Sequence, residues 1–133
     1  MLSDKPVVFS AKRISKDFGA GKSLKTAVKD VSFDIYDEEF ISIVGGSGCG
    51  KSVLAKIMLG LYQPTRGQFL YRDKPIKNLK DHWNEVQSVF QDPFGCFNQF
   101  FTIRSQLEDA LNILKVKPSK EEVRRRVDEG LLA

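Results

Sequence analysis

The chain has 133 residues, a length typical of one domain, with 41% hydrophobic and 29% charged side chains. Its net charge is +4 and its basic side chains are scattered, so a nucleic-acid-binding surface is not indicated. The two cysteines, Cys49 and Cys96, exclude a disulfide framework, and no apolar run approaches the roughly 20 residues that span a bilayer. The N-terminus also lacks the pattern of a secretory signal, so we expect a cytosolic protein.

The first part of the chain predicts antiparallel strands. Residues 7–14 and 30–36 alternate partly between apolar and polar side chains, which predicts two strands that each expose one face. The segment between them is rich in Gly, Lys and Ser, and we expect it to be a loop. Residues 40–44, FISIV, are nearly all apolar, which is typical of a strand buried on both faces.

The middle of the chain predicts a helix and two further strands. Residues 51–61 carry apolar side chains at helical spacing: Val53, Leu54, Ile57, Met58 and Leu61. Residues 63–67 contain Pro and Gly and predict a turn, and short strands are expected at 68–72 and 86–90. Strands that alternate with helices indicate an α/β sheet.

The last third of the chain predicts two helices. From Thr102 on, apolar residues recur at helical intervals. Ser119 is a plausible N-cap of the final helix, and Glu121 and Glu122 suit the positive end of its dipole. The only histidine, His82, is expected to be a solvated surface residue.

The most informative stretch is GGSGCGKS at residues 45–52, which fits the pattern G-x-x-x-x-G-K-[ST] between a predicted strand and a predicted helix. Glycines let successive N–H groups turn inward around an anion, and the helix adds its positive end. Lys51 is placed to contact the β- and γ-phosphates of a nucleoside triphosphate, and the Ser52 hydroxyl to bind Mg²⁺. The alternative is a flexible glycine turn. The residues expected around the phosphates are Gly45, Gly46, Ser47, Gly48, Cys49, Gly50, Lys51 and Ser52.

The residues around this loop resemble the N-terminal half of an ABC transporter ATPase subunit. The strand–loop–helix segment leads into a turn with the family's spacing, made by Gly60, Leu61, Pro64 and Gly67. The stretch SVFQDPFGCFNQFF resembles the family's Q-loop, with Gln91 as its name residue, and FQDP followed by Asn98 is similar to ATPases of oligopeptide and dipeptide importers. The resemblance covers about residues 6–133.

The resemblance implies a P-loop NTPase (ABC ATPase) fold of the α/β class, truncated within the domain. Residues 6–90 would form an N-terminal antiparallel β-subdomain and the P-loop core, 91–101 the Q-loop, and 102–133 the start of a helical subdomain. Such a partial domain, 1–133, would expose an apolar sheet face and an unpaired edge. We therefore expect marginal stability and a tendency to associate.

The resemblance also implies roles outside the loop. Phe18, in KDFG, would stack on adenine, and Gln91 would contact Mg²⁺ or the attacking water and sense a transmembrane partner. Lys51 and Gln91 are thus the expected catalytic residues. The alternatives are a loop-anchoring Phe18 and an exposed glutamine at a strand end. Residues 92–106 would lie near the groove where a coupling helix of the membrane subunit docks.

The sequence departs from the family's pattern in several places. Family members usually have Gly-Glu where this chain has Glu38-Glu39, and the importer motif SLNP is replaced by GCFNQ. Importer ATPases also commonly carry other residues in place of Gly46 and Cys49. We expect alkylation or oxidation of Cys49 to weaken nucleotide binding and ATP to protect it; the alternative is a buried, inert thiol.

The elements that complete hydrolysis in this family are not found in the sequence. No apolar run ends in Asp-Glu, no LSGGQ-type signature occurs, and His82 lies too early to be the switch histidine. We therefore expect that this chain alone does not hydrolyse ATP efficiently. In a complete subunit, the resemblance implies ATP, Mg²⁺, permease subunits and a second ATPase subunit at the inner face of the membrane. The alternatives are a non-catalytic nucleotide-binding module and an unrelated P-loop kinase or GTPase.

Overall fold

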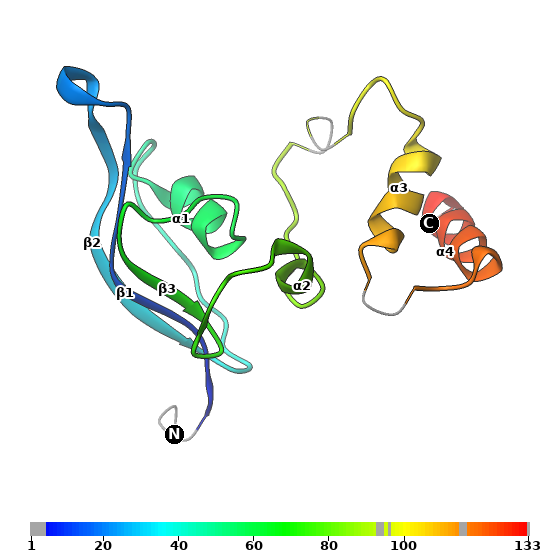
Figure 1. Cartoon of the computed structure of the whole chain (residues 1–133), viewed down its shortest axis with the longest axis horizontal. Helices are drawn as coiled ribbons and strands as arrows, with labels where there is room; N and C mark the ends of the chain where they lie inside the picture. Colours follow the sequence, from blue (N-terminus) through cyan, green and yellow to red (C-terminus); the bar gives the residue numbers. More distant parts are fainter. Residues whose placement is uncertain (1–4, 93–94, 96, 115–116, 133) are drawn as a thin grey trace. The chain divides into compact units, whose positions relative to one another are not determined.

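A computed structural model describes residues 5–92, 95, 97–114 and 117–132 of the chain. The structure divides into two compact units, Met1–Leu79 and Lys80–Ala133. The first unit contains the sheet and helix α1, and the second contains α3 and α4 (Figure 1). Over the described residues, no helix combines the length and the apolar composition needed to cross a membrane.

The first unit is built on a four-stranded sheet with the order β2-β1-β3-β4. Strand β1 (Val7–Phe18) pairs antiparallel with β2 (Lys25–Tyr36) on one side and with β3 (Arg66–Tyr71) on the other. A two-residue strand β4 (Lys74–Pro75), which the sequence analysis did not predict, pairs with β3. The predicted antiparallel strands at the N-terminus are therefore confirmed.

The loop predicted between the first two strands is mostly wrong, because β1 and β2 extend toward each other almost to their connection. Lys16 pairs with Val28, and Phe18 pairs with Lys25, so polar residues that resemble a loop lie within the ladder. A strand that exposes one face accepts such residues, because its stability comes from pairing and from its apolar face. Only the short connection between the strands, with a 3₁₀ turn at Gly21–Ser23, is irregular.

The core of the first unit lies between the sheet and helix α1 (Lys51–Met58). Its buried members come from three strands and the helix: Ala11, Ile14, Val28, Ile57 and Phe69. The predicted helix is confirmed, and its apolar side packs on this core with Ile57 only 1% exposed. Leu61 lies beyond the helix and is exposed, so its predicted place on the buried side is wrong.

The two remaining predicted strands, 40–44 and 86–90, are absent from the structure. Both were read from apolar composition, yet Phe40 and Val89 are fully exposed, at 103% and 100%. A strand exists only where a neighbouring strand satisfies its backbone groups, and burial on both faces needs covering layers. No strand of the sheet formed by the described residues pairs with either segment.

The second unit contains helices α3 (Ile103–Asn112) and α4 (Lys120–Leu132), as predicted. Thr102 caps α3 by accepting a hydrogen bond from the Ser105 N–H, at 3.2 Å. Ser119 caps α4 in the same way, from the Glu122 N–H at 3.2 Å, which confirms the predicted N-cap.

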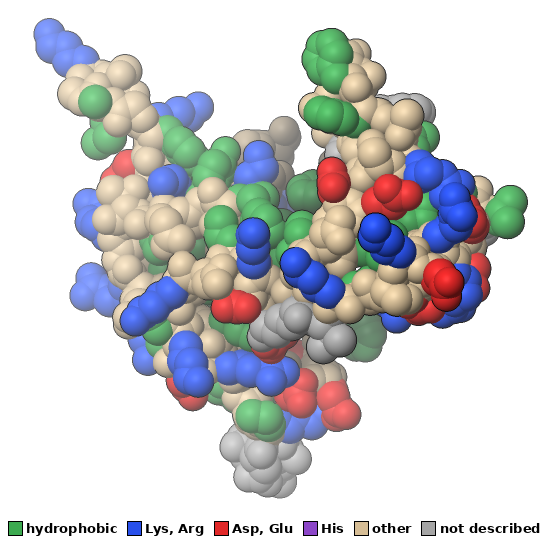
Figure 2. All heavy atoms as spheres, turned by 45° about the vertical axis from the view of Figure 1, so that its right-hand side comes forward, with side chains coloured by type: hydrophobic (Ala, Val, Ile, Leu, Met, Phe, Trp, Pro, Cys, Tyr) green, Lys and Arg blue, Asp and Glu red, His purple; other side chains and the backbone are tan. Residues whose placement is uncertain are grey.

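Contact between the two helices of this unit is partly polar. An ion pair of 2.7 Å joins Arg104 of α3 to Asp128 of α4, and Val127 is the one residue of these helices that is buried. Over part of the face shown in Figure 2, acidic and basic side chains lie close together, which agrees with the exposed ion pairs of α4.

A short helix, α2 (Leu79–Trp83), was not predicted, and it changes the interpretation of His82. The side chain of His82 is 5% exposed, so its expected solvation is wrong. The backbone N–H groups of Glu85 and Val86 donate to its carbonyl oxygen and continue the turn beyond the helix. Because only Leu79 and Trp83 are spaced as an apolar helical pair, the periodicity was too short to predict this element.

Candidate nucleotide-binding site

The glycine-rich loop joins the exposed segment 40–44 to helix α1. Gly48 and Gly50 have φ angles of 76° and 98°, in the left-handed region that favours glycine. A Cβ atom at Gly50 would lie 2.4 Å from the carbonyl oxygen of Ala27 in β2. Glycine at this position is therefore required both by the turn of the loop and by its close approach to the sheet.

The loop ends at the N-terminus of α1, where backbone N–H groups are available to a ligand. Gly50 is the N-cap, and the first hydrogen bond of the helix runs from the Leu54 N–H to the Gly50 oxygen, at 2.9 Å. The N–H groups before Leu54 have no acceptor within the helix, and they lie at the positive end of its dipole. Ser52 is exposed in this first turn. The arrangement fits an anion with an associated cation beside the hydroxyl.

The Lys51 side chain folds back over the loop that precedes it. Its Nζ donates to the carbonyl oxygens of Gly45 and Gly46, both at 2.8 Å, and lies 3.7 Å from the Cys49 Sγ. The ammonium group is thus held within the loop where the sequence analysis expected phosphate. A bound polyphosphate would take it from these two carbonyl groups.

Cys49 is exposed, so the alternative of a buried thiol is wrong. Its Sγ would lie 2.6 Å from a Cβ atom at Gly45, so the thiol covers the start of the loop. A group attached to this sulfur would compete for the same space and lie close to the Lys51 ammonium group. Weakened nucleotide binding after alkylation remains a prediction, and this geometry gives its reason. Cys96 lies outside the described residues.

Phe18 lies at the end of β1, in the same unit as the loop. Its ring is 37% exposed and meets the Tyr62 ring edge to face, with the centroids 5.4 Å apart. Tyr62 follows α1 and also contacts Lys56 of that helix, which links Phe18 indirectly to the helix that begins at Lys51. The sequence analysis missed Tyr62; its only signal is an aromatic residue just after the predicted helix.

Gln91 belongs to the second unit and is exposed. The structure thus brings together the loop, Lys51 and Ser52, and it places Phe18 in the same unit. Gln91 is not part of that unit. The neighbouring motif residue Pro93 lies outside the described residues.

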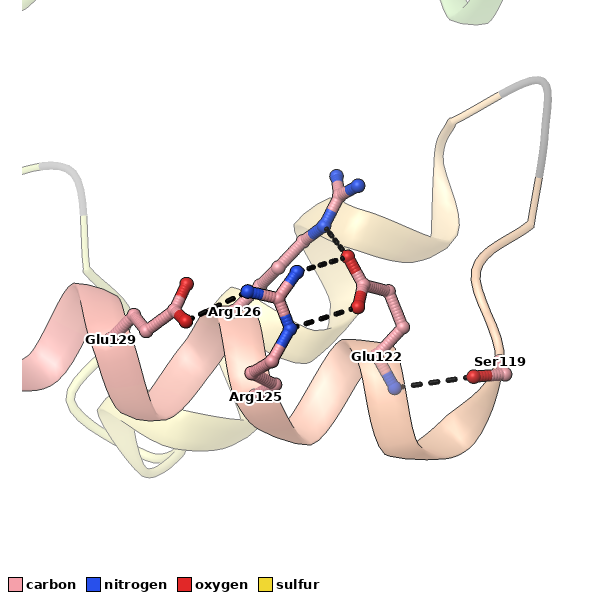
Figure 3. A network of polar contacts seen from close by, with 5 residues as sticks. All are labelled: Ser119, Glu122, Arg125, Arg126 and Glu129. Carbon is pink, nitrogen blue, oxygen red and sulfur yellow. Dashed lines mark hydrogen bonds and ion pairs between the residues drawn. The ribbon is translucent and has the colours of Figure 1, made fainter.

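The one strongly perturbed carboxyl group of the described residues, Glu122, lies outside this loop, in α4. Hydrogen bonds from Arg125, and then from Arg126, lower the pKa of Glu122 from 4.5 to about 2. Arg126 Nε lies 2.6 Å from the Glu122 carboxylate, and Arg125 also binds Glu129 at 2.8 Å (Figure 3). Every charge here has a partner on the same helix, so the network serves the helix rather than a reaction.

Three features define a P-loop nucleotide-binding protein. They are a glycine loop that approaches strand β2 closely, the helix that follows the loop, and a lysine at the start of that helix whose ammonium group lies in the loop. The family model described as "ABC transporter" matches residues 28–131. The chain therefore belongs to the ABC transporter family and corresponds to part of an ATP-binding domain.

Individual relatives agree with this assignment. The chain is 33% identical over 126 residues to the oligopeptide transport ATP-binding protein OppF of Bacillus subtilis, covering 90% of this chain and 41% of that protein. It is 37% identical over 114 residues to the nickel import ATP-binding protein NikE of Brucella suis, covering 80% and 42%. The chain thus spans about two fifths of the length of these curated relatives.

The fold is likewise that of a known structure. The dimeric, post-hydrolysis structure of the ATP-binding cassette MJ0796 with ADP and Pi matches with a TM-score of 0.77 at 28% identity. The match covers 91% of this chain and 54% of that one. The predicted ABC ATPase fold is therefore confirmed for the part that the chain contains.

Proposed function

We propose that this chain is the ATP-binding part of an importer ATPase subunit, which in complete form couples ATP hydrolysis to solute uptake. The loop carries this proposal, because its glycines, helix N-terminus and Lys51 form a cradle suited to phosphate. Family membership and the ADP-bound relative support ATP as the ligand.

Each expected site residue has a role in this proposal. Residues 45–52 surround the phosphates. The Lys51 ammonium group exchanges its hydrogen bonds to the loop carbonyl oxygens for contacts with the β- and γ-phosphates. Ser52 and Gln91 would hold Mg²⁺, which would supply positive charge to neutralise the phosphates. Phe18 carries the adenine ring on its exposed face.

The proposed partners are a second ATPase subunit and the permease subunits of an importer. The related cassette MJ0796 is dimeric, which supports the first. Among residues 92–106, Phe100 is 82% exposed and Phe97 and Phe101 are also exposed, which suits docking of an apolar helix. We also propose the domain arrangement in which 6–90 is the β-subdomain with the P-loop core, 91–101 the Q-loop and 102–133 the start of a helical subdomain. The docking residues 92–106 would then lie in the Q-loop and at the start of the helical subdomain. The subunit would then lie at the cytoplasmic face of the membrane.

We propose a peptide as the solute, on the basis of FQDP with Asn98 and the oligopeptide transport relative. The nickel import relative supports a nickel ion as the second candidate. Uptake of labelled peptide and of nickel by the complete assembly decides between them, since one solute should accumulate and the other should not.

Titration with Mg-ATP tests nucleotide binding directly. Lys51→Ala removes a charged contact to phosphate, and we expect affinity to fall roughly thirtyfold to a hundredfold, about 2–3 kcal/mol. Lys22→Ala is the matched control, because it removes one exposed positive charge from the connection between β1 and β2. Equal affinity of the wild-type chain and Lys51→Ala would overturn the proposed role of the loop.

A further inference from the structure

Two lysines and two aromatic rings form a cluster that includes a residue of helix α1, the helix that begins at the candidate site. The Lys16 Nζ lies 5.2 Å from the ring centroid of Phe18 and 5.7 Å from that of Tyr62. The Lys56 Nζ lies 5.3 Å from the Tyr62 centroid. We call these four residues the aromatic–lysine cluster. It connects the end of β1 to helix α1 and the segment that follows it.

Two members of the cluster contact the ring of Phe18. The edge-to-face contact with Tyr62, at an interplanar angle of 71°, sets its tilt. Lys16 cannot move freely, because its Nζ also donates to the carbonyl oxygen of Gln63 at 2.8 Å. Phe18 nevertheless lies outside the buried core and keeps part of its ring exposed. A ring that is both held and accessible is suited to receive a flat ligand.

We propose that Tyr62 and Lys16 position Phe18 as the platform for the nucleotide base. Lys16 covers one side of the ring and restricts the base to the other, and Tyr62 holds the ring at a fixed tilt. This inference rests on the proposed function, since it needs a nucleotide bound at the loop that precedes α1. Tyr62 and Lys16 are positioning residues, because they act through Phe18.

Prior fixation of Phe18 explains why such a cluster would raise affinity. An exposed phenylalanine loses side-chain freedom when a base stacks on it, and this loss weakens binding. In the cluster, the edge-to-face contact and the cation–π contacts restrict the ring before the ligand arrives. The benefit concerns the base alone, so it is absent for a ligand that consists only of phosphates.

The test compares two ligands, Mg-ATP and magnesium tripolyphosphate, by calorimetric titration. Tyr62→Leu should weaken binding of ATP about threefold to tenfold and leave binding of tripolyphosphate unchanged within twofold. Tyr62→Phe keeps the ring and should restore the ATP affinity. Lys22→Met removes an exposed cation from the connection between β1 and β2, outside the cluster, and it serves as the matched control with unchanged selectivity between the ligands.

The outcomes separate this inference from the proposed function. If the wild-type chain binds neither ligand, the proposed function fails and the inference with it. If the wild-type chain binds ATP but Tyr62→Leu leaves the ratio of the two affinities unchanged, the inference alone is overturned, including when both affinities fall together. Lys16→Met gives an independent check and should lower the same ratio severalfold if the protein retains its wild-type circular dichroism spectrum.

Discussion

The two units of this chain are stabilised in different ways. In the first, the core joins residues far apart in the sequence, such as Ile14 of β1, Ile57 of α1 and Phe69 of β3. In the second, α4 carries ion pairs between residues three or four positions apart, and Val127 is its one buried residue. The comparison teaches that long-range apolar burial organises the first unit, whereas the second has little burial and more contacts that are local in sequence, such as helix caps and weak exposed ion pairs.

The largest effect should come from a cavity in the first unit. Ile57→Ala removes a side chain that is 1% exposed, and it should reduce the free energy of unfolding of the first unit by about 2–5 kcal/mol. The matched change in the second unit, Val127→Ala, removes less apolar volume and should cost about 1–2 kcal/mol. Urea titration with hydrogen exchange of the β1 amides reports the first unit.

Trp83 is the chain's single tryptophan and lies in the second unit, so its fluorescence reports that unit separately. Ile57→Ala should shift the protection of β1 much more than the Trp83 transition, and Val127→Ala should do the reverse. Equal shifts of both probes in both variants would contradict the distinction between the units.

Glycine substitutions should have opposite signs in the two units. Gly67 of β3 has a φ of 79°, and a Cβ atom there would lie 2.2 Å from the Arg13 carbonyl oxygen of β1. Gly67→Ala should therefore destabilise the first unit by at least about 1–3 kcal/mol. Gly130 of α4 has open space around it, so Gly130→Ala should stabilise that helix by about 0.5–1 kcal/mol. Thermal unfolding followed by circular dichroism measures both, and a loss of stability in both variants would count against this difference.

Loss of the α4 cap should have a smaller effect. Ser119→Ala removes the acceptor of the Glu122 N–H and should cost about 1 kcal/mol, with fraying of the first turn of α4. Ser119→Asp keeps an acceptor and should retain the stability. Amide exchange at Glu121 and Glu122 measures the fraying, and unchanged exchange in Ser119→Ala would show that the cap does not stabilise the turn.

The smallest effect concerns the pH dependence of α4. The pKa of Glu122 is about 2 in the folded chain, below its ordinary 4.5, so the folded state favours the charged carboxylate. Its stabilising contribution is present above pH 4.5 and is lost as the pH falls toward 2. Helix content between pH 5 and pH 2 should therefore fall more in the wild-type chain than in Glu122→Gln. Glu121→Gln changes the neighbouring carboxylate and should follow the wild type; identical curves for Glu122→Gln and wild type would exclude the contribution.

Local signals explain which parts of the fold were predictable. Helix α1, the cap at Ser119 and one face of β1 are each encoded by residues close in sequence, and the structure contains them. The conformation of the segment 40–44 was not predictable in the same way. Its apolar composition is typical of a strand, but a strand forms only where a neighbouring strand pairs with its backbone, and composition does not show whether such a neighbour exists. The sequence analysis underestimated the length of β1 and β2. Here a neighbouring strand is present, and pairing with it keeps polar residues in strands although their composition resembles a loop.

The candidate site shows the same division. The loop from Gly45 to Ser52 could be predicted, because its chemistry needs particular residues at fixed spacing. The contact of Phe18 with Tyr62 could not, since these residues meet only after β1 and α1 pack on one core. The burial of His82 depended on a short helix without a clear periodic pattern.

The position of Lys51 has a consequence for how affinity should be understood. Its ammonium already binds two loop carbonyl oxygens, so the proposed phosphate ligand would gain this charge only by replacing them, and water would then solvate those oxygens. We therefore expect substitution of Lys51 to remove two hydrogen bonds that stabilise the loop as well as the proposed contact to phosphate. In this proposal, the order of the loop without ligand and its affinity for nucleotide both depend on Lys51, because the loop carbonyl oxygens and the phosphates compete for the same ammonium group.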